Sequence, residues 1–211
     1  MKRLIPLLWC LLLFVACEKE QEPLPSYIEG LVELHADPNG ILRTLVTEKG
    51  QSYGLLNPQS GGTPNKVYRA YTIYTLSSSG ATLYQLDLVL SEPAVKNNID
   101  WVKQYPVELV SLWKTQSRWV NLHMRIPAGE GQNTFDWVWT NIEKKNGAQG
   151  AYKKLYLTLS SMVKDTPYLY KKDYFISCPL APFSDQLQKG VDSICVSVNT
   201  NNGRVERTFI Y

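Results

Sequence analysis

Residues 119–126 read Trp-Val-Asn-Leu-His-Met-Arg-Ile, and this stretch decides the fold class. Its two alternating sets are the apolar Val120, Leu122, Met124 and Ile126 and the more polar Trp119, Asn121, His123 and Arg125. Because successive side chains of a strand point to opposite faces, the alternation predicts a β-strand with one buried face. His123 falls on the polar face, where we expect an exposed surface residue.

The same half of the chain contains six further strand-like segments separated by turns. They span residues 107–113, 135–142, 153–159, 174–180, 192–198 and 205–211. We expect a charged, glycine-bearing turn at 144–150 and an Asn-rich hairpin turn at 199–203. Seven short strands at hairpin spacing predict an antiparallel β-sandwich, to which we assign residues 99–211.

The first half shows a second group of short strands. They span residues 27–35, 41–47, 51–56, 66–76 and 82–90, with strong turn residues at 37–40 and a Pro- and Gly-rich loop at 57–65. Five strands in so short a segment suit a small OB-like barrel, assigned to residues 27–98. Since no segment keeps a helical period, the predicted fold class is all-β, a barrel followed by a sandwich.

The N-terminus has the pattern of a bacterial lipoprotein signal. Lys2 and Arg3 precede an apolar run at 4–16, which is shorter than the roughly 20 residues of a membrane span. Ala16 stands directly before Cys17, so we predict a signal peptide at 1–16, lipid attachment at Cys17 and a flexible tether at 17–26. The alternatives are cleavage elsewhere or an uncleaved anchor. The expected location is extracytoplasmic, at the outer membrane or cell surface.

Charge and composition limit the classes of partner that we expect. The 211 residues carry a net charge of +3, which includes the two cations of the signal, and 44% of them are hydrophobic. This is enough apolar sequence for packed cores, and the charge gives no reason to expect nucleic acid. The barrel has few of the basic and aromatic residues with which OB-folds bind single-stranded nucleic acid, namely Lys66, Tyr68, Arg69, Tyr71 and Tyr74.

Cys178 and Cys195 are the two cysteines of the folded part. An extracytoplasmic location would permit a disulfide between them. The strand patterns place Cys178 with apolar neighbours and Cys195 between two serines, Ser193 and Ser197. This mismatch of faces favours two unpaired thiols over a disulfide.

The search for catalytic chemistry is mostly negative. The chain has two histidines, His35 and His123, and none of the common motifs for metal, phosphate or nucleophile chemistry. We therefore expect no catalytic residue, no metal and no cofactor. Glu130, Asp136 and Glu143 could supply the carboxylate pair of a glycosidase, which keeps a cell-surface glycan hydrolase as an alternative.

Phe135, Trp137 and Trp139 alternate along one segment, so the three rings share one face. An exposed face of this kind could stack on a ligand, for example on sugar rings. A buried one would form the centre of a sandwich core, because each ring buries about 150–250 Å². We favour the core and keep ligand stacking as the alternative.

Several segments resemble the C-terminal domain of NigD-like lipoproteins. They are residues 106–113 and 119–122, the run 155–159 followed by Asp165, and then 175–180, 192–194 and 205–211. The resemblance implies a cell-envelope lipoprotein of the Bacteroidota, with an N-terminal OB domain and a C-terminal β-sandwich. It implies no catalytic residue. This chain has Ser160-Ser161-Met162 where relatives carry a basic stretch, and Cys178 where an aromatic residue is usual.

Together these features favour a non-enzymatic binding or interaction module at the membrane surface. Its partners would be the membrane, through the N-terminal lipid, and a protein, peptide or glycan. The first alternative is a bacteriocin-immunity lipoprotein, which rests on the family resemblance alone.

Overall fold

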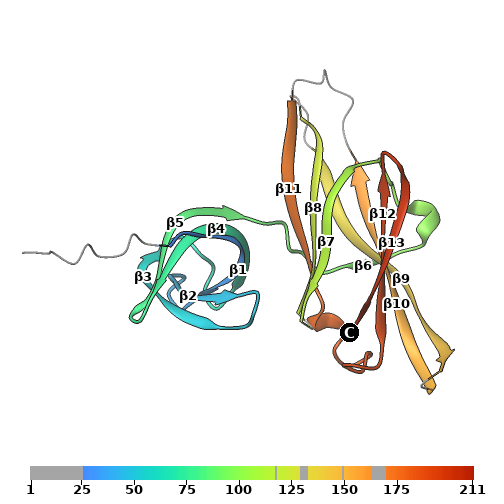
Figure 1. The fold of residues 1–211 in the computed structure, drawn as a ribbon, viewed down its shortest axis with the longest axis horizontal. Coiled ribbons are helices and arrows are strands. Elements are labelled where there is room, and N and C mark those ends of the chain that lie inside the picture. The colour runs from blue at the N-terminus through green and yellow to red at the C-terminus, as the bar shows by residue number, and fades with distance from the viewer. Residues whose placement is uncertain (1–25, 117, 129–132, 149, 163–169) are drawn as a thin grey trace, which may run out of the picture.

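The computed structural model describes residues 26–116, 118–128, 133–148, 150–162 and 170–211. Figure 1 shows a β-barrel and a larger β-sandwich, joined by one connecting segment. The predicted signal peptide, Cys17 and almost all of the tether lie outside the described residues, as do Glu130 and Asp165. None of the helices described is long and apolar enough to cross a membrane.

The barrel consists of the five strands that the first half of the sequence predicts. They are β1 (Ile28–Ala36), β2 (Leu42–Thr47), β3 (Ser52–Gln59), β4 (Val67–Ser77) and β5 (Gly80–Leu88). They close in the order β1-β2-β3-β5-β4 around a core that includes Leu34, Leu45 and Ala70. The turn before β2 needs Gly40, whose φ of +75° is in the left-handed region.

The sandwich contains all seven predicted strands. They are β7 (Glu108–Thr115), β8 (Trp119–Ala128), β9 (Thr134–Gly147), β10 (Gly150–Met162), β11 (Tyr170–Pro179), β12 (Ser193–Thr200) and β13 (Gly203–Ile210). One sheet has the order β13-β12-β10-β9-β6 and the other β11-β8-β7. The apolar row of β8, from Val120 to Ile126, is fully buried between the sheets, as its alternation predicts.

The details of the sandwich differ from the prediction in three places. The residues expected as a turn at 144–150 mostly continue the strands, because β9 runs to Gly147 and β10 resumes at Gly150. The paired ends of β9 and β10 are largely exposed on both faces, so their sequence lacks the alternation of apolar and polar residues that marks a strand. A short β6 (Val95–Lys96) pairs with β9, so the sandwich begins before residue 99. Finally, β10 and β12 are parallel, whereas the sequence suggested an antiparallel arrangement.

Candidate functional site

The barrel docks against the outer face of the three-stranded sheet through a buried arginine. Arg69 on β4 has a side chain that is 1% exposed, and it reaches across to the sandwich. Its guanidinium donates to Glu48 Oε1 at 2.7 Å and to Asn121 Oδ1 at 3.1 Å. Ser177 Oγ donates to the same Asn121 oxygen at 2.8 Å. Burial lowers the pKa of Arg69, but its carboxylate partner opposes that effect, so the group stays charged.

Two glutamates of the barrel complete this contact. Glu33, 4% exposed, accepts hydrogen bonds from Arg118 and from Trp119 Nε1, the latter at 2.6 Å. Glu48 accepts from Thr115 Oγ1 at 2.7 Å and from Trp113 Nε1 at 3.2 Å. Because the buried Glu33 and the half-buried Glu48 have several partners each, the contact fixes one relative placement of the two domains.

A stack of three rings extends the contact at its edge. Phe175 on β11 lies between Tyr71 of the barrel and His123 of β8, with both pairs of ring centroids 4.2 Å apart. His123 Nε2 lies 2.6 Å from Asp173 Oδ1, so His123 is not the freely exposed residue that the sequence suggested. The His123 hydrogen bond holds the pKa of Asp173 below its usual value. Burial and a hydrogen bond to Glu29 raise the pKa of Tyr71 to about 12.

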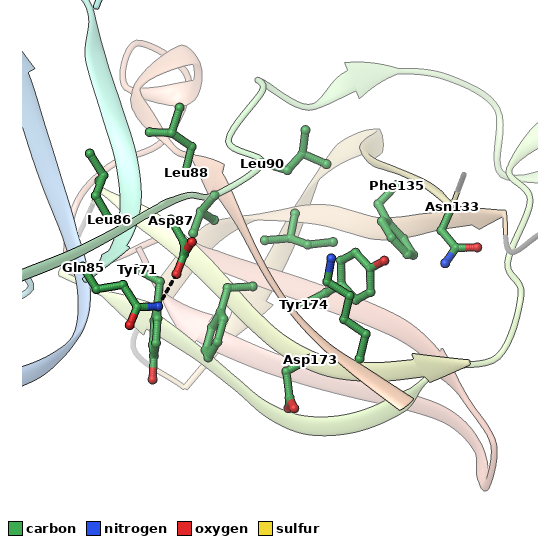
Figure 2. A pocket seen from close by; sticks show the side chains of 14 residues that line it. Tyr71, Gln85, Leu86, Asp87, Leu88, Leu90, Asn133, Phe135, Asp173 and Tyr174 are labelled. Atoms are coloured by element: carbon green, nitrogen blue, oxygen red, sulfur yellow. Dashed lines mark hydrogen bonds between the residues drawn. The ribbon is translucent and has the colours of Figure 1, made fainter. Parts of the chain in front are cut away.

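A groove of about 670 Å³ opens beside this stack, between the end of the barrel and the edge of the sandwich (Figure 2). Its barrel wall is Tyr71 and residues 85–90. Its sandwich wall is Asn133, Phe135 and residues 172–176. The volume is in the range of about 300–1,000 Å³ that is typical of ligand sites. Leu88 and Leu90 on its rim are 64% and 42% exposed, so apolar surface remains uncovered here.

The aromatic triad of the sequence analysis is part of the sandwich core. Trp137 is 3% exposed and Phe135 7%, and Trp139 packs against the same cluster. The shared face that could have stacked on a ligand is therefore turned inward, because the opposite sheet covers it. Of the three, Phe135 also lines the groove, where the centroid of its ring lies 5.4 Å from that of Tyr174.

Asp136 and Glu143, the two carboxylates considered for hydrolysis that the structure describes, do not form a pair with each other. Asp136 and Glu143 lie seven residues apart on the extended β9, which separates them by roughly 20 Å. A glycosidase pair needs a separation of no more than about 9.5 Å. Glu143 is instead held by Lys145, Asn141 and Tyr156, which lower its pKa. Among the described residues, no cluster of three or more His, Cys, Asp or Glu could hold a metal ion.

Cys178 and Cys195 are both buried free thiols. Cys178 points into the sandwich core, and desolvation raises its pKa to about 12. Cys195 lies outside that core cluster, between Ser193 and Ser197 on β12. The two therefore sit on different faces, as the mismatch of their neighbours indicated.

The fold and groove define a class of two-domain β-proteins, an OB-like barrel followed by a β-sandwich. No family model and no curated protein matches the chain. Solved structures do match across its length. A NigD-like immunity protein from Bacteroides caccae ATCC 43185 is 19% identical, with a TM-score of 0.61 over 90% of this chain and 98% of that one.

Two further structures share the fold. A candidate toxin-related protein from Parabacteroides distasonis ATCC 8503 is 15% identical, with a TM-score of 0.65 over 88% of this chain and 93% of that one. A candidate lipoprotein from Bacteroides fragilis NCTC 9343 is 11% identical, with a TM-score of 0.62 over 87% and 96%. The resemblance to NigD-like proteins is thus confirmed at the level of the fold.

Proposed function

We propose that this protein is a lipid-anchored, non-enzymatic binding module of the cell envelope, which holds a protein partner in the groove between its two domains. The observation that carries the proposal is the groove itself, with uncovered Leu88 and Leu90 on its rim and aromatic side chains in its wall. Exposed apolar surface at a concave site is typical of surfaces that bind partners.

The buried contact between the domains supports this proposal. A groove formed by two bodies keeps its shape only if the bodies keep their positions. Charge-assisted hydrogen bonds join them, from Arg69 to Asn121, from Trp119 to Glu33 and from Thr115 to Glu48. A pre-formed groove costs its ligand less conformational entropy on binding.

The anchor is the second part of the proposal. Cys17 follows a short apolar run behind Lys2 and Arg3, and the Bacteroides fragilis structure with the same fold is described as a candidate lipoprotein. Attachment at Cys17 would keep the groove close to the membrane surface. Cys17→Ala should therefore release the protein from the membrane fraction without changing its fold.

The groove is tested by photo-crosslinking in cells that carry the gene. A benzophenone amino acid replaces Leu88 in the full-length chain, and a matched control places the same group at Val110, which is 41% exposed on β7. We expect a discrete protein adduct from position 88 that is weak or absent from position 110. Adducts of equal pattern at both positions, or none at position 88, would contradict a partner in the groove.

Immunity against a bacteriocin is a second candidate, favoured by one observation. The matching Bacteroides caccae structure is described as a NigD-like immunity protein. In this version the partner in the groove is a toxin, and deletion of the gene should make the cell sensitive to it. Unchanged sensitivity to the bacteriocins of neighbouring strains would remove this candidate and leave the binding module.

A further inference from the structure

The strand β11 has an unpaired edge that faces the groove. On one side it pairs with β8 along its whole length. On the other side the Ser177 N–H donates to Leu90 O at 2.9 Å, next to a single parallel bridge between Leu90 and Ile176. Among the described strands, nothing else pairs with β11 on that side.

The alternation of backbone groups shows which atoms this edge presents. In an antiparallel pair, the N–H groups of successive residues point to opposite sides of the strand. The pairing of β11 with β8 has no register shift, and the Ser177 N–H points away from β8. The N–H groups of Phe175 and Asp173 therefore also point away from β8, toward the groove.

The opposite wall presents a second edge of the same kind. The Val89 N–H donates to Arg69 O on β4, so the N–H groups of Leu86 and Leu88 point away from β4. On that side the described part of β3 meets β5 in one bridge, between Leu55 and Ala81. Both walls of the groove thus offer backbone hydrogen-bonding groups. Apolar side chains also line both walls (Figure 2).

We propose that the groove binds an extended segment of the protein partner, which adds to β11 as a further strand beside Asp173 and Phe175. This inference rests on the proposed function and names how the partner is held. The chain already makes the first contact of such an addition, because Leu90 forms a parallel bridge with Ile176 at the side of the groove. An added strand continues that existing interface along β11.

The side chains of the groove indicate what kind of segment fits. Asp173 is engaged by His123 and Arg125, Asp87 by Gln85, and the Lys172 ammonium lies over the Tyr174 ring. Because each of these charged side chains already has a hydrogen-bond, ion-pair or cation–π partner, we expect no ion pair between the groove and its ligand. The segment is therefore uncharged in its centre, and alternate apolar side chains rest on Leu88, Leu90 and Tyr174.

The test uses a heptapeptide library displayed on phage, selected against the wild-type protein. Enriched peptides are synthesised and then methylated at one backbone nitrogen at a time. The segment pairs with β11 and meets the β5 wall through its side chains. Only alternate backbone N–H groups therefore bond to the protein, so we expect binding to fall by about fivefold or more at every second position. A peptide bound through its side chains alone would tolerate methylation without this period of two.

Two variants at position 173 test whether the backbone N–H at the edge of β11 takes part in binding. Asp173→Pro removes the edge N–H, which takes no part in the pairing with β8, and Pro is tolerated at such edge positions. Asp173→Ala is the matched control, since it loses the same carboxylate but keeps the N–H. We expect the selected peptides to bind Asp173→Pro about fivefold or more weakly than Asp173→Ala.

The outcomes separate this inference from the proposed function. Equal binding to the two Asp173 variants and no alternation in the methylation series would overturn strand addition. A surviving adduct at position 88 would then leave the binding module intact. Failure of the library to yield any peptide that competes with the adduct, or competition by a glycan instead, would also overturn the inference. Loss of the adduct itself would remove the proposed function as well.

Discussion

Replacement of Arg69 by Met removes the charged centre of the contact between the domains. Met keeps an unbranched apolar chain in a site where the Arg69 side chain is 1% exposed, so packing changes little. Three donor contacts are lost, to Glu48 at 2.7 Å, to Asn121 at 3.1 Å and a longer one to Ser177 at 3.4 Å. The remaining acceptors then lack a buried cation.

The expected cost follows from burial. Breaking a buried ion pair by removal of one partner costs about 3–5 kcal/mol of unfolding free energy. Glu48 is 35% exposed and recovers part of its hydration, which places Arg69→Met at the lower end, about 3 kcal/mol. Urea denaturation of the chain from Ser26 onward, followed by tryptophan fluorescence, measures this loss.

Arg43→Met is the matched control. Arg43 forms an ion pair with Asp37 inside the barrel, but its side chain is 54% exposed. Such surface pairs contribute about 0–1 kcal/mol. If Arg69→Met cost no more than Arg43→Met, the buried network around Arg69 would not stabilise the fold in the way we describe. Combination with Asn121→Ala should be non-additive, because the two residues share one hydrogen bond.

Three further predictions concern single groups. The pKa of Asp173 is lowered first by the His123 hydrogen bond, so its ionised carboxylate stabilises the fold above pH 3.8, and this stabilisation is lost as the pH falls through the lowered pKa. Asp173→Asn should therefore flatten the acid side of a profile of melting temperature against pH. An unchanged acid side would contradict the pairing of Asp173 with His123. Cys178, whose pKa is raised to about 12 by burial, should resist iodoacetamide at pH 8 until urea unfolds the protein, and rapid labelling of the native state would argue against its buried position. Gly40→Ala should lower the unfolding free energy by more than about 1 kcal/mol, since φ is +75° and an added Cβ collides with a carbonyl of the neighbouring loop. Gly54→Ala, with open space around the added carbon, should cost less, and equal losses in calorimetry would refute the steric argument.

The strands and the fold class could be predicted from local patterns in the sequence. Alternation along β8 and the turn residues around Gly40 are local properties, because a strand buries one face whatever it packs against. All five barrel strands and seven sandwich strands were predictable on this basis. The two-residue β6 was not, because its pairing depends on the position of β9 and leaves no pattern in so short a segment.

Whether the polar face of a strand meets solvent or the other domain depends on the tertiary structure. Asn121 and Trp119 alternate with core residues and so look solvent-facing, yet the barrel covers both. Their partners Arg69 and Glu33 are 52 and 86 residues away along the chain, and no local period records such a contact. The one signal was a large aromatic residue, Trp119, on a face that otherwise looked polar.

The groove has the same origin. The sequence predicts β5 and β11 separately, but the unpaired state of their edges depends on which strands fail to lie beside them. Hydrogen-bond pairing between strands is a long-range property that the topology of each sheet sets, and the docking of the two domains then brings the two edges to one groove. The sequence therefore determines the elements, and the packing of the barrel on the sandwich decides where a partner can bind.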